Sequence, residues 1–393
     1  MTQFEKALEI AMSSVRQLEA EEVAIENSHG RILAQDVTSD MDMPPFDKSA
    51  MDGYACRRED LGNELTVIEE IPAGYVPKCS IKPNQCAKIM TGGMVPEGAD
   101  CVIMVEFTEN PTENTVVFTG KKTKGNIRLK AHHVQKGNVV LTSGIKLTPP
   151  HIAVAATFGC ASLLVSRQPR VGVTATGNEL VEPGEQPLPS QIRNSNGYQI
   201  CAHTASTGAI PTYYGIARDT ENSLDKMIKT ARAENDVIIL SGGVSMGDYD
   251  LVPGLLEKNG FHLLFEKIDI KPGRPTVFGV SGDSFCFGLP GNPVSTFVTF
   301  ELLVKPFLYK MMGHSFKPPL LPMPLEHDIK RKKSDRTSWI PVIFTDTHGI
   351  ATIEYHGSDH IDSLSAADGM ISIPEGITEI KKGETVHVRS IRT

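Results

Sequence analysis

The sequence predicts a multidomain protein that combines a doubly wound α/β domain with β-rich domains. Three observations predict this class. Apolar strand-like runs alternate with helix-like stretches between residues 171 and 309, which is typical of a parallel sheet covered by helices. Short, partly alternating runs before and after this segment indicate β structure. A chain of 393 residues also exceeds what one hydrophobic core usually organises, so two to four domains are expected.

The N-terminal part predicts one helix followed by mostly β structure. Thr2 and a glutamate three residues later have capping-box spacing, and apolar residues recur at helical spacing to about Leu18. From about residue 22 to 139, short runs are separated by Pro-Pro, Gly-Gly and Pro-Glu-Gly turns. A second helix is expected over Thr148–Phe158. Prolines and charges around Arg167–Arg170 indicate a domain boundary.

The α/β domain is predicted to begin with a strand at Val171–Ala175. Its strand at Val237–Leu240 is apolar throughout, as expected for a strand buried on both faces. The other expected elements are the helix Asn196–Ser206 with Ser195 as N-cap, the strand Ile210–Ile216, a helix capped by Thr220, the helix Leu251–Asn259, the strand Ser284–Gly288 and the helix Val294–Tyr309.

The C-terminal part predicts a proline-rich connector at Lys317–Pro324 and then a small β-barrel or sandwich. The expected strands are Ser338–Phe344, Ile350–Tyr355, Met370–Ile373 and Thr385–Val388.

The composition argues against several classes of protein. The net charge is −8 and no lysine/arginine-rich block is identified, so no nucleic-acid partner is expected. A protein of this charge that binds a phosphorylated ligand should concentrate its few cations in one place. No apolar stretch approaches the length of a membrane span, and the polar N-terminus does not resemble a signal peptide. Seven scattered cysteines without a CxxC pair predict neither a zinc site nor a disulfide framework, and they favour the cytoplasm.

Three loops are expected at the carboxyl ends of the strands in the α/β domain, where such sheets bind ligands. They are TATGNEL (Thr174–Leu180), SGGVSMGDYD (Ser241–Asp250) and LPGNP (Leu289–Pro293). Glycines let backbone NH groups approach an anion, and a following helix N-terminus adds a favourable dipole. Each loop alone could be a tight turn, but three at successive strand ends favour a site for a phosphorylated ligand. The GxGxxG and GxxxxGK[ST] fingerprints are both absent from the sequence.

Cations are expected near these loops in the segment EKIDIKPGRP. Lys267, Asp269 and Lys271 would point the same way on a strand, and Arg274 follows in the turn. Such a group suits a phosphate or another oxyanion, although a solvated strand face is the alternative.

Carboxylates are expected at the same sheet edge. Glu179, Asp219, Asp248 and Asp250 all fall in its loops, and carboxylates beside a phosphate loop commonly hold Mg²⁺. Asp219 could instead be a turn residue, and Asp248 or Asp250 could cap the next helix. Two further polar segments, PPFDKSAMDGYA (44–55) and TGGMVPEGAD (91–100), indicate only connecting turns when taken alone.

These motifs, together with IKPGRP, resemble in order and spacing those of the MoeA family of molybdopterin molybdenumtransferases, to which the gephyrin E domain is similar. The resemblance covers essentially the whole chain. It implies a discontinuous domain I (residues 1–46 and 139–168), a β-rich domain II (47–138), a MogA-like molybdopterin-binding α/β domain III (169–314) and a β-barrel domain IV (315–393). It also implies an elongated homodimer, whose active cleft lies between domains III and IV of one subunit and domain II of the other.

The implied reaction is the Mg²⁺-dependent insertion of molybdate into adenylylated molybdopterin, with release of AMP. A partner enzyme that adenylylates molybdopterin is a further expectation. Two alternatives stay open: the chain could itself be a molybdopterin adenylyltransferase, or it could be a non-catalytic scaffold or paralogue.

The resemblance also implies roles for individual residues. The catalytic residues it implies are Asp52, Thr91, Glu179, Asp219, Asp250, Lys267 and Lys271, of which Glu179, Asp219 and Asp250 would bind the metal. The residues it implies for molybdopterin binding are Thr176, Gly177, Ser241, Gly242, Gly243, Ser245, Gly247, Pro290, Gly291, Asn292, Pro293 and Ser358. For Ser358, a simple β-turn is an equal alternative.

The chain departs from the family pattern at two places. Asn178 stands where the family often has aspartate. Ala131, His132 and His133 stand where the resemblance expects Gly-Glu-Asp, so the usual acid of that loop is absent. These departures favour a specialised or less active paralogue.

Overall fold

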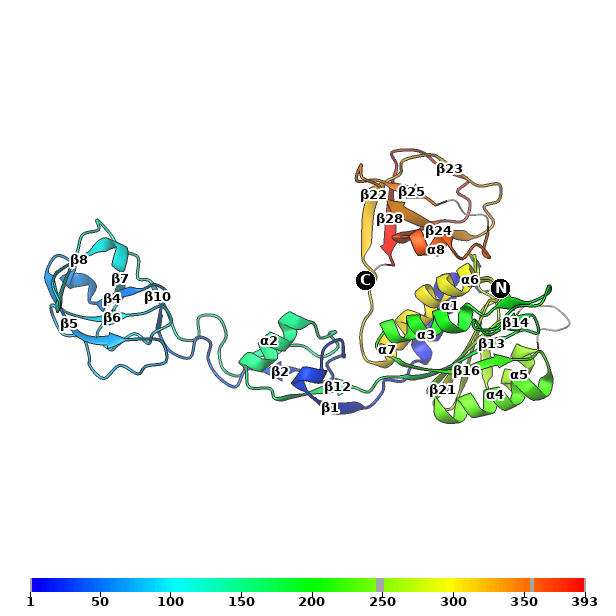
Figure 1. Cartoon of the computed structure of the whole chain (residues 1–393), viewed down its shortest axis with the longest axis horizontal. Coiled ribbons are helices and arrows are strands. Elements are labelled where there is room, and N and C mark those ends of the chain that lie inside the picture. The colour runs from blue at the N-terminus through cyan, green and yellow to red at the C-terminus, as the bar shows by residue number, and fades with distance from the viewer. Residues whose placement is uncertain (1, 245–250, 354–356, 392–393) are drawn as a thin grey trace.

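The computed structural model describes residues 2–244, 251–353 and 357–391, and it shows an elongated chain with four lobes (Figure 1). We name them the distal lobe (residues 43–134), the middle lobe (19–42 and 135–166), the α/β lobe (2–18 and 167–313) and the C-terminal lobe (314–391). The first three follow one another along the long axis, and the C-terminal lobe lies beside the α/β lobe. Among the described residues, no helix is long and apolar enough to cross a membrane.

The distal lobe is built on one mixed sheet, as the short runs of its sequence predict. The strand order is β7-β4-β6-β5-β9-β8. The strands are β4 (Gly53–Cys56), β5 (Glu64–Ile71), β6 (Gln85–Ile89), β7 (Cys101–Met104), β8 (Thr108–Thr112) and β9 (Thr115–Phe118). Both faces of β4 are buried, since Ala55 packs in one apolar cluster while Tyr54 and Cys56 pack in another. The pair β3 (Lys48–Ser49) and β10 (Ile127–Arg128) closes the lobe where the chain enters and leaves it.

The middle lobe consists of two passes of the chain, one outgoing and one returning. They pair as β1 (Ala20–Ala24) with β12 (Ser162–Ser166) and as β2 (Val37–Thr38) with β11 (Val139–Leu141). Helix α2 (Pro149–Thr157) agrees with the predicted helix to within one residue at each end. Its start is fixed by a capping box between Thr148 and His151.

The α/β lobe contains a six-stranded sheet of order β16-β13-β17-β21-β20-β18. Its strands are β13 (Arg170–Thr176), β16 (Ile210–Ala217), β17 (Val237–Ser241), β18 (His262–Phe265), β20 (Val277–Ser281) and β21 (Ser284–Leu289). The first four strands in this order are parallel, which confirms the predicted doubly wound class. The antiparallel strands β20 and β18 at one edge were not predicted.

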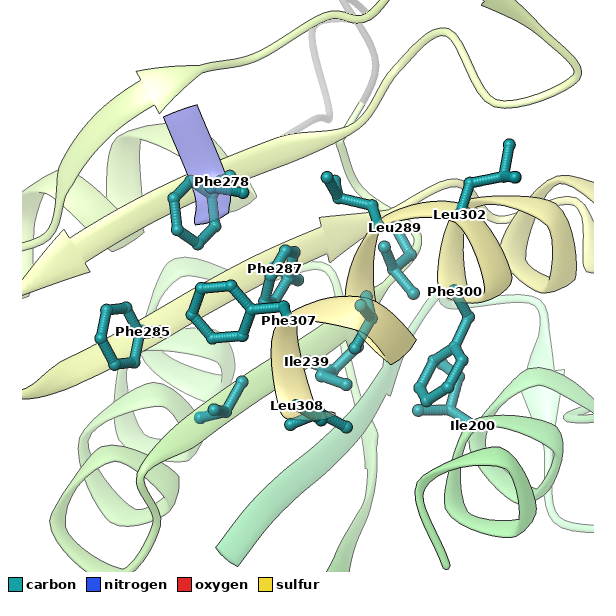
Figure 2. Packing of buried hydrophobic residues seen from close by; sticks show 14 of the residues in the cluster. Ile200, Ile239, Phe278, Phe285, Phe287, Leu289, Phe300, Leu302, Phe307 and Leu308 are labelled. Atoms are coloured by element: carbon teal, nitrogen blue, oxygen red, sulfur yellow. The ribbon is translucent and has the colours of Figure 1, made fainter. Parts of the chain in front are cut away.

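Two apolar cores cover the two faces of this sheet. Alternate residues of β17 enter different cores: Val237 and Ile239 face one, and Ile238 and Leu240 face the other. Helices α3 (Asn196–Ser206), α4 (Glu221–Glu234) and α5 (Val252–Lys258) supply side chains from the flanks. Figure 2 shows Phe285, Phe287 and Phe307 grouped in the larger core, where the rings of Phe287 and Phe307 meet edge to face at 5.1 Å.

Several predicted details of the helices are wrong. Helix α1 (Phe4–Ser14) has no side-chain cap, because Thr2 instead bridges to Ile268, and it ends at Ser14 because Val15 is extended. Ser195 does not cap α3 through its side chain, whereas Thr220 does cap α4. Helix α1 packs in the α/β core through Ala7 and Ala11. The single helix predicted over 294–309 is α6 (Pro293–Thr299), a π-helical segment (Phe300–Val304) and α7 (Lys305–Met311).

The C-terminal lobe is a β domain, as expected. Its sheet has the order β19-β24-β26-β28-β22, with β25 beside β24, and the pair β23–β27 shares its apolar core. The strands are β22 (Leu320–Pro324), β23 (Ile329–Lys330), β24 (Thr337–Phe344), β25 (Ile350–Thr352), β26 (Gly369–Ile373), β27 (Glu379–Ile380) and β28 (Thr385–Ser390), and α8 spans Ser363–Ala366.

Two segments of this lobe correct the sequence-based expectation. The predicted connector at 317–324 contains strand β22, which tolerates its prolines because it lies at the edge of the sheet. The segment EKIDIK does not form one strand in the α/β sheet. Only β19 (Ile270–Lys271) is a strand, and it pairs in parallel with β24 of the C-terminal lobe. This segment therefore joins the two lobes.

Candidate functional site

A cavity of about 640 Å³ opens at the carboxyl ends of β13, β17 and β21 and is also lined by the C-terminal lobe. We call it the loop cavity. Most residues of the three predicted loops meet here, although their roles stay a prediction. The predicted site residues that line it are Thr176, Gly177, Glu179, Asp219, Ser241, Gly242, Gly243, Pro290, Gly291, Asn292 and Pro293. Ser245, Gly247, Asp248 and Asp250 lie outside the described residues.

The glycines of SGG are required by a close approach to Thr176. Gly242 and Gly243 have φ values of +98° and +64°, where glycine is favoured. A Cβ on Gly242 would lie 2.5 Å from the carbonyl oxygen of Thr176, and one on Gly243 would lie 2.9 Å from its Oγ1. The NH of Gly242 already donates to the carbonyl of Leu289. This NH therefore stabilises the fold and does not point to a bound anion.

Asn196 joins the loops at the floor of the cavity, and sequence reasoning missed it. Its Nδ2 donates to Ser241 Oγ at 2.8 Å and to the carbonyl of Gly291 at 2.6 Å. The Ser241 hydroxyl donates in turn to the carbonyl of Pro290 at 3.2 Å. The Oδ1 of Asn196 and the Oγ1 of Thr176 are buried without a hydrogen-bond partner among the described residues. Asn196 follows the predicted N-cap Ser195, and no motif in the sequence marks it as a site residue.

Two predicted carboxylates, Glu179 and Asp219, line the loop cavity. Asp219 is oriented by Asn178, whose NH donates to Asp219 Oδ2 at 3.0 Å while its Oδ1 accepts from the NH of Asp219 at 3.2 Å. The carboxylate of Glu179 folds back over Gly177. Asp359 adds a third acid from the C-terminal lobe. No group of three or more metal-ligating side chains occurs within the part of the chain that the structure describes.

The oxygen ligands nevertheless fit Mg²⁺. This ion usually takes one or two protein carboxylates and completes its shell with water and substrate phosphates. Glu179 and Asp219 supply such a pair beside the loops.

A second, larger cavity of about 970 Å³ adjoins the first, and the two share Pro275, Pro290, Gly291 and Asn292. We call it the basic cavity. Its cationic lining comes from both lobes and consists of Lys271, Arg274, Lys330, Arg331, Lys332, Lys333 and Arg336. The statement that the sequence has no lysine/arginine-rich block is therefore wrong, since Lys330–Lys333 is such a run. The expected concentration of cations in one place is found in this cavity. Lys267 is not among the described residues that line either cavity.

Some cations of the basic cavity already bind other groups of the protein, and the others do not pair with any described residue. Arg331 donates to the carbonyls of Ile377 and Pro374 and to Ser338 Oγ. Burial lowers the pKa of Arg331. Lys330 pairs with Glu379 at 3.3 Å, and Arg336 pairs with Asp335 at 3.5 Å. The remaining four cations form no ion pair with any described residue and are available to an anion: Lys271, Arg274, Lys332 and Lys333.

Ser358 fastens the C-terminal lobe to the LPGNP turn. Its Oγ accepts from Asn292 Nδ2 at 2.6 Å, and its carbonyl accepts from the NH of Val294 at 3.0 Å. Because Val294 lies in the first turn of α6, this carbonyl satisfies one of the free NH groups of the helix end. Ser358 thus borders the basic cavity and also connects the C-terminal lobe to the α/β lobe.

Asp52 and Thr91 are brought together, but in the distal lobe, far from both cavities of the same chain (Figure 1). The backbone NH and the hydroxyl of Thr91 both donate to Asp52 Oδ1, at 2.5 and 2.8 Å. These bonds, the backbone one first, lower the pKa of the Asp52 carboxyl. The pair is exposed, so it is accessible to another molecule.

The unusual loop at residues 131–133 also lies in the distal lobe. Ala131 has a φ of +60°, a left-handed conformation that a glycine would adopt more easily. Its NH donates to the carbonyl of Pro44 at 2.9 Å. The rings of His132 and His133 lie 5.2 Å apart at 64°.

Comparison with known proteins places the whole chain in one family. Residues 2–159 match the model of the "MoeA N-terminal region (domain I and II)", residues 172–310 that of a "Probable molybdopterin binding domain", and residues 324–391 that of the "MoeA C-terminal region (domain IV)".

Relatives and solved structures agree with these matches. A protein of Bacillus subtilis (strain 168) named molybdopterin molybdenumtransferase is 36% identical over 391 residues, covering 96% of this chain and 91% of its own length. A protein of the same name from Nostoc sp. (strain PCC 7120) is 35% identical over 388 residues, with 95% and 89% covered. A crystal structure of a molybdopterin biosynthesis MoeA protein from Pyrococcus horikoshii OT3 superposes with a TM-score of 0.86 at 31% identity, covering 99% of each chain. The chain belongs to the MoeA family.

Proposed function

We propose that this enzyme is a molybdopterin molybdenumtransferase that inserts molybdate into adenylylated molybdopterin and releases AMP. The observation that supports this most directly is the junction of two cavities of opposite character at the LPGNP turn. One presents carboxylates beside glycine loops, and the other presents seven cations, including four that form no ion pair with any described residue. A substrate with phosphates and a second, separate oxyanion needs both environments.

The loop cavity would hold the phosphate end of the pterin substrate. Mg²⁺ held by Glu179 and Asp219 would neutralise phosphate charge when the phosphoanhydride is cleaved. The reciprocal hydrogen bonds between Asn178 and Asp219 would orient the Asp219 carboxylate for binding Mg²⁺. The LPGNP turn, fixed by Asn196 and Ser358, would hold the substrate between the lobes.

The basic cavity would hold molybdate. A tetrahedral dianion is attracted by several cations that are not already neutralised. Within the described part of the chain, Lys271, Arg274, Lys332 and Lys333 meet this condition. Lys267, which the family pattern pairs with Lys271, would act from outside the lining of this cavity.

Asp52 and Thr91 would act in the site of a second subunit. Within one chain they lie at the opposite end of the molecule from both cavities, so a role in the reaction requires a homodimer. The preset carboxylate of Asp52 would then approach the cleft of the partner copy.

The function is tested by AMP release from adenylylated molybdopterin, with Mg²⁺ and with or without molybdate. We expect molybdate-dependent release by the natural chain and a loss of about 100-fold or more in Asp219→Asn. The double variant Lys332→Ala/Lys333→Ala should need more molybdate, whereas Lys226→Ala, an exposed lysine on α4, should not. Release that does not depend on molybdate would contradict the proposal. ATP consumption with plain molybdopterin would favour the adenylyltransferase alternative.

The shared site is tested by mixing two inactive variants. In Asp52→Asn and Asp219→Asn homodimers, each site carries one defect. A mixed dimer contains one site with both defects and one intact site, so random mixing should restore about a quarter of the natural activity. If the subunits exchange and no activity returns, Asp52 does not act across the dimer.

A further inference from the structure

Two large apolar side chains face the loop cavity from opposite lobes. Ile192, on the α/β side, is 59% exposed, and Ile361, on the C-terminal side, is 37% exposed. Large aliphatic side chains that line a concave site and are left exposed commonly mark a surface that a ligand covers. Neither side chain has a role in the phosphate, metal or oxyanion chemistry described above.

Ile192 lies on a short flap that is held in place by its own hydrogen bonds. The flap pairs β14 (Leu180–Val181) with β15 (Ile192–Arg193), and the NH of Ile192 donates to the carbonyl of Glu179 at 2.8 Å. The carboxylate of Glu182 accepts from Tyr198 and Tyr213 at 3.0 and 2.8 Å, which anchors the flap to α3 and β16. Ile192 is therefore exposed on a segment that hydrogen bonds hold in one position.

Ile361 is held with similar precision. It lies three residues beyond Ser358, whose bonds to Asn292 and Val294 tie this turn to the α/β lobe. The NH of Ile361 donates to the carbonyl of Asp359 at 2.9 Å, and its own carbonyl accepts from Leu364 at the start of α8. The two isoleucines are thus presented to one cavity by two independently anchored segments.

We propose that Ile192 and Ile361 form an apolar clamp for a flat heterocyclic ring of the ligand. This inference rests on the proposed function, because it assigns the ring end of the substrate whose phosphate end lies at the carboxylates. A flat heterocycle has two apolar faces and a polar edge, so aliphatic side chains from two sides cover its faces while the edge stays hydrated. The pterin and the adenine of an adenylylated pterin share this chemistry.

The clamp is tested in the full-length protein with Ile192→Ala, Ile361→Ala and the double variant. Leu188→Ala is the matched control, because Leu188 is on the same flap and is 65% exposed but does not line the cavity. Two probes are used separately: pterin, followed by its own fluorescence, and AMP, followed by calorimetry. For the ring that the clamp holds, we expect about tenfold weaker binding for each single variant and no change for Leu188→Ala. The probe whose affinity falls identifies the ring.

The same variants separate the clamp from the proposed function. In the AMP-release assay, the Michaelis constant for adenylylated molybdopterin should rise about tenfold with little change in kcat, since the clamp contributes to binding. An active natural enzyme whose isoleucine variants bind both probes and substrate normally would overturn the clamp. A natural protein that binds neither ring would overturn it as well. Weakened ring binding in a protein without molybdate-dependent AMP release would keep the clamp and refute the proposed function.

Discussion

At the scale of residues, neighbouring cations of one sequence run differ in role: Arg331 stabilises the fold, whereas Lys332 and Lys333 face a cavity. Arg331 is bonded to the carbonyls of Ile377 and Pro374 and to Ser338, so its charge is used to close the C-terminal lobe. Lys332 and Lys333 follow it directly and face the basic cavity without an ion pair to any described residue. The sequence alone shows four consecutive basic residues and cannot separate these tasks, because the separation depends on carbonyls that lie about 45 positions further along the chain.

This difference predicts different effects of substitution. Arg331→Met should lower the free energy of unfolding by about 2–3 kcal/mol, since it leaves several carbonyls of the lobe without their charged donor. Lys332→Ala should leave the free energy of unfolding unchanged, because an exposed lysine that pairs with no described residue contributes little to stability. Urea unfolding of both variants measures this. Equal stability of the two variants would show that the Arg331 bonds are not structural.

The position of a site residue is predictable from the sequence where its motif lies wholly within one loop. Thr176, Ser241 and Gly291 were placed correctly at one sheet edge because strand ends of a parallel sheet meet there. Asn196 was missed because its role exists only when Ser241 and Gly291 converge on it. Their functions in the reaction stay a prediction.

At the scale of elements, the helical segment 293–311 shows what apolar periodicity leaves undetermined. The pattern predicted a helix, and the segment is helical throughout, but Phe300–Val304 forms a π-helical turn. This turn places Glu301 in a buried group with Lys305 on α7 and His203 on α3. Glu301 Oε1 lies 3.0 Å from Lys305 Nζ and 3.8 Å from His203 Nδ1. Burial outweighs the attraction of Glu301 and lowers the pKa of His203 to about 4.

The lowered pKa predicts how stability depends on pH. An unfolded histidine has a pKa of about 6.5, so between about pH 4 and 6.5 the unfolded chain binds a proton that folded His203 does not. Stability should therefore fall as pH falls through this window, by about 2–3 kcal/mol from this residue. His203→Gln should lack that part of the slope. Urea midpoints of both proteins at pH 7, 6, 5 and 4.5 measure the difference, and parallel curves would contradict it.

At the scale of the whole molecule, three lobes meet around α7 and the segment that follows it. Tyr309 accepts a hydrogen bond from Lys146 of the middle lobe at 3.2 Å, and its ring stacks on Phe316 at 4.9 Å. Lys305 and Arg389 lie over the ring of Phe316 at 5.3 and 5.8 Å. The position of the C-terminal lobe, and with it the width of both cavities, is therefore linked to α7.

The lobe architecture was predictable only in part. Changes in apolar pattern along the chain separate β-rich from α/β segments, so the fold class could be predicted. The family matches confirm this class. The pattern could not show that α1 packs in the α/β core or that β19 joins the C-terminal sheet, because both depend on contacts between distant segments. The domain boundaries themselves stay a prediction.

Arg389, on the last strand of the C-terminal lobe, contacts the α/β lobe. It is buried, donates to the carbonyl of Glu301 and lies 4.0 Å from the Glu301 carboxylate. Arg389→Met keeps most of the apolar side chain but removes these bonds, while Lys305 still neutralises Glu301. We therefore expect the lobe to remain folded and its docking to weaken by about 2–4 kcal/mol. Calorimetry should show the C-terminal lobe unfolding in a separate, earlier transition, and scattering should show a larger radius of gyration. A single transition with an unchanged radius would mean that the other contacts, among them Ser358, β19 and the buried Met370, hold the two lobes together without Arg389.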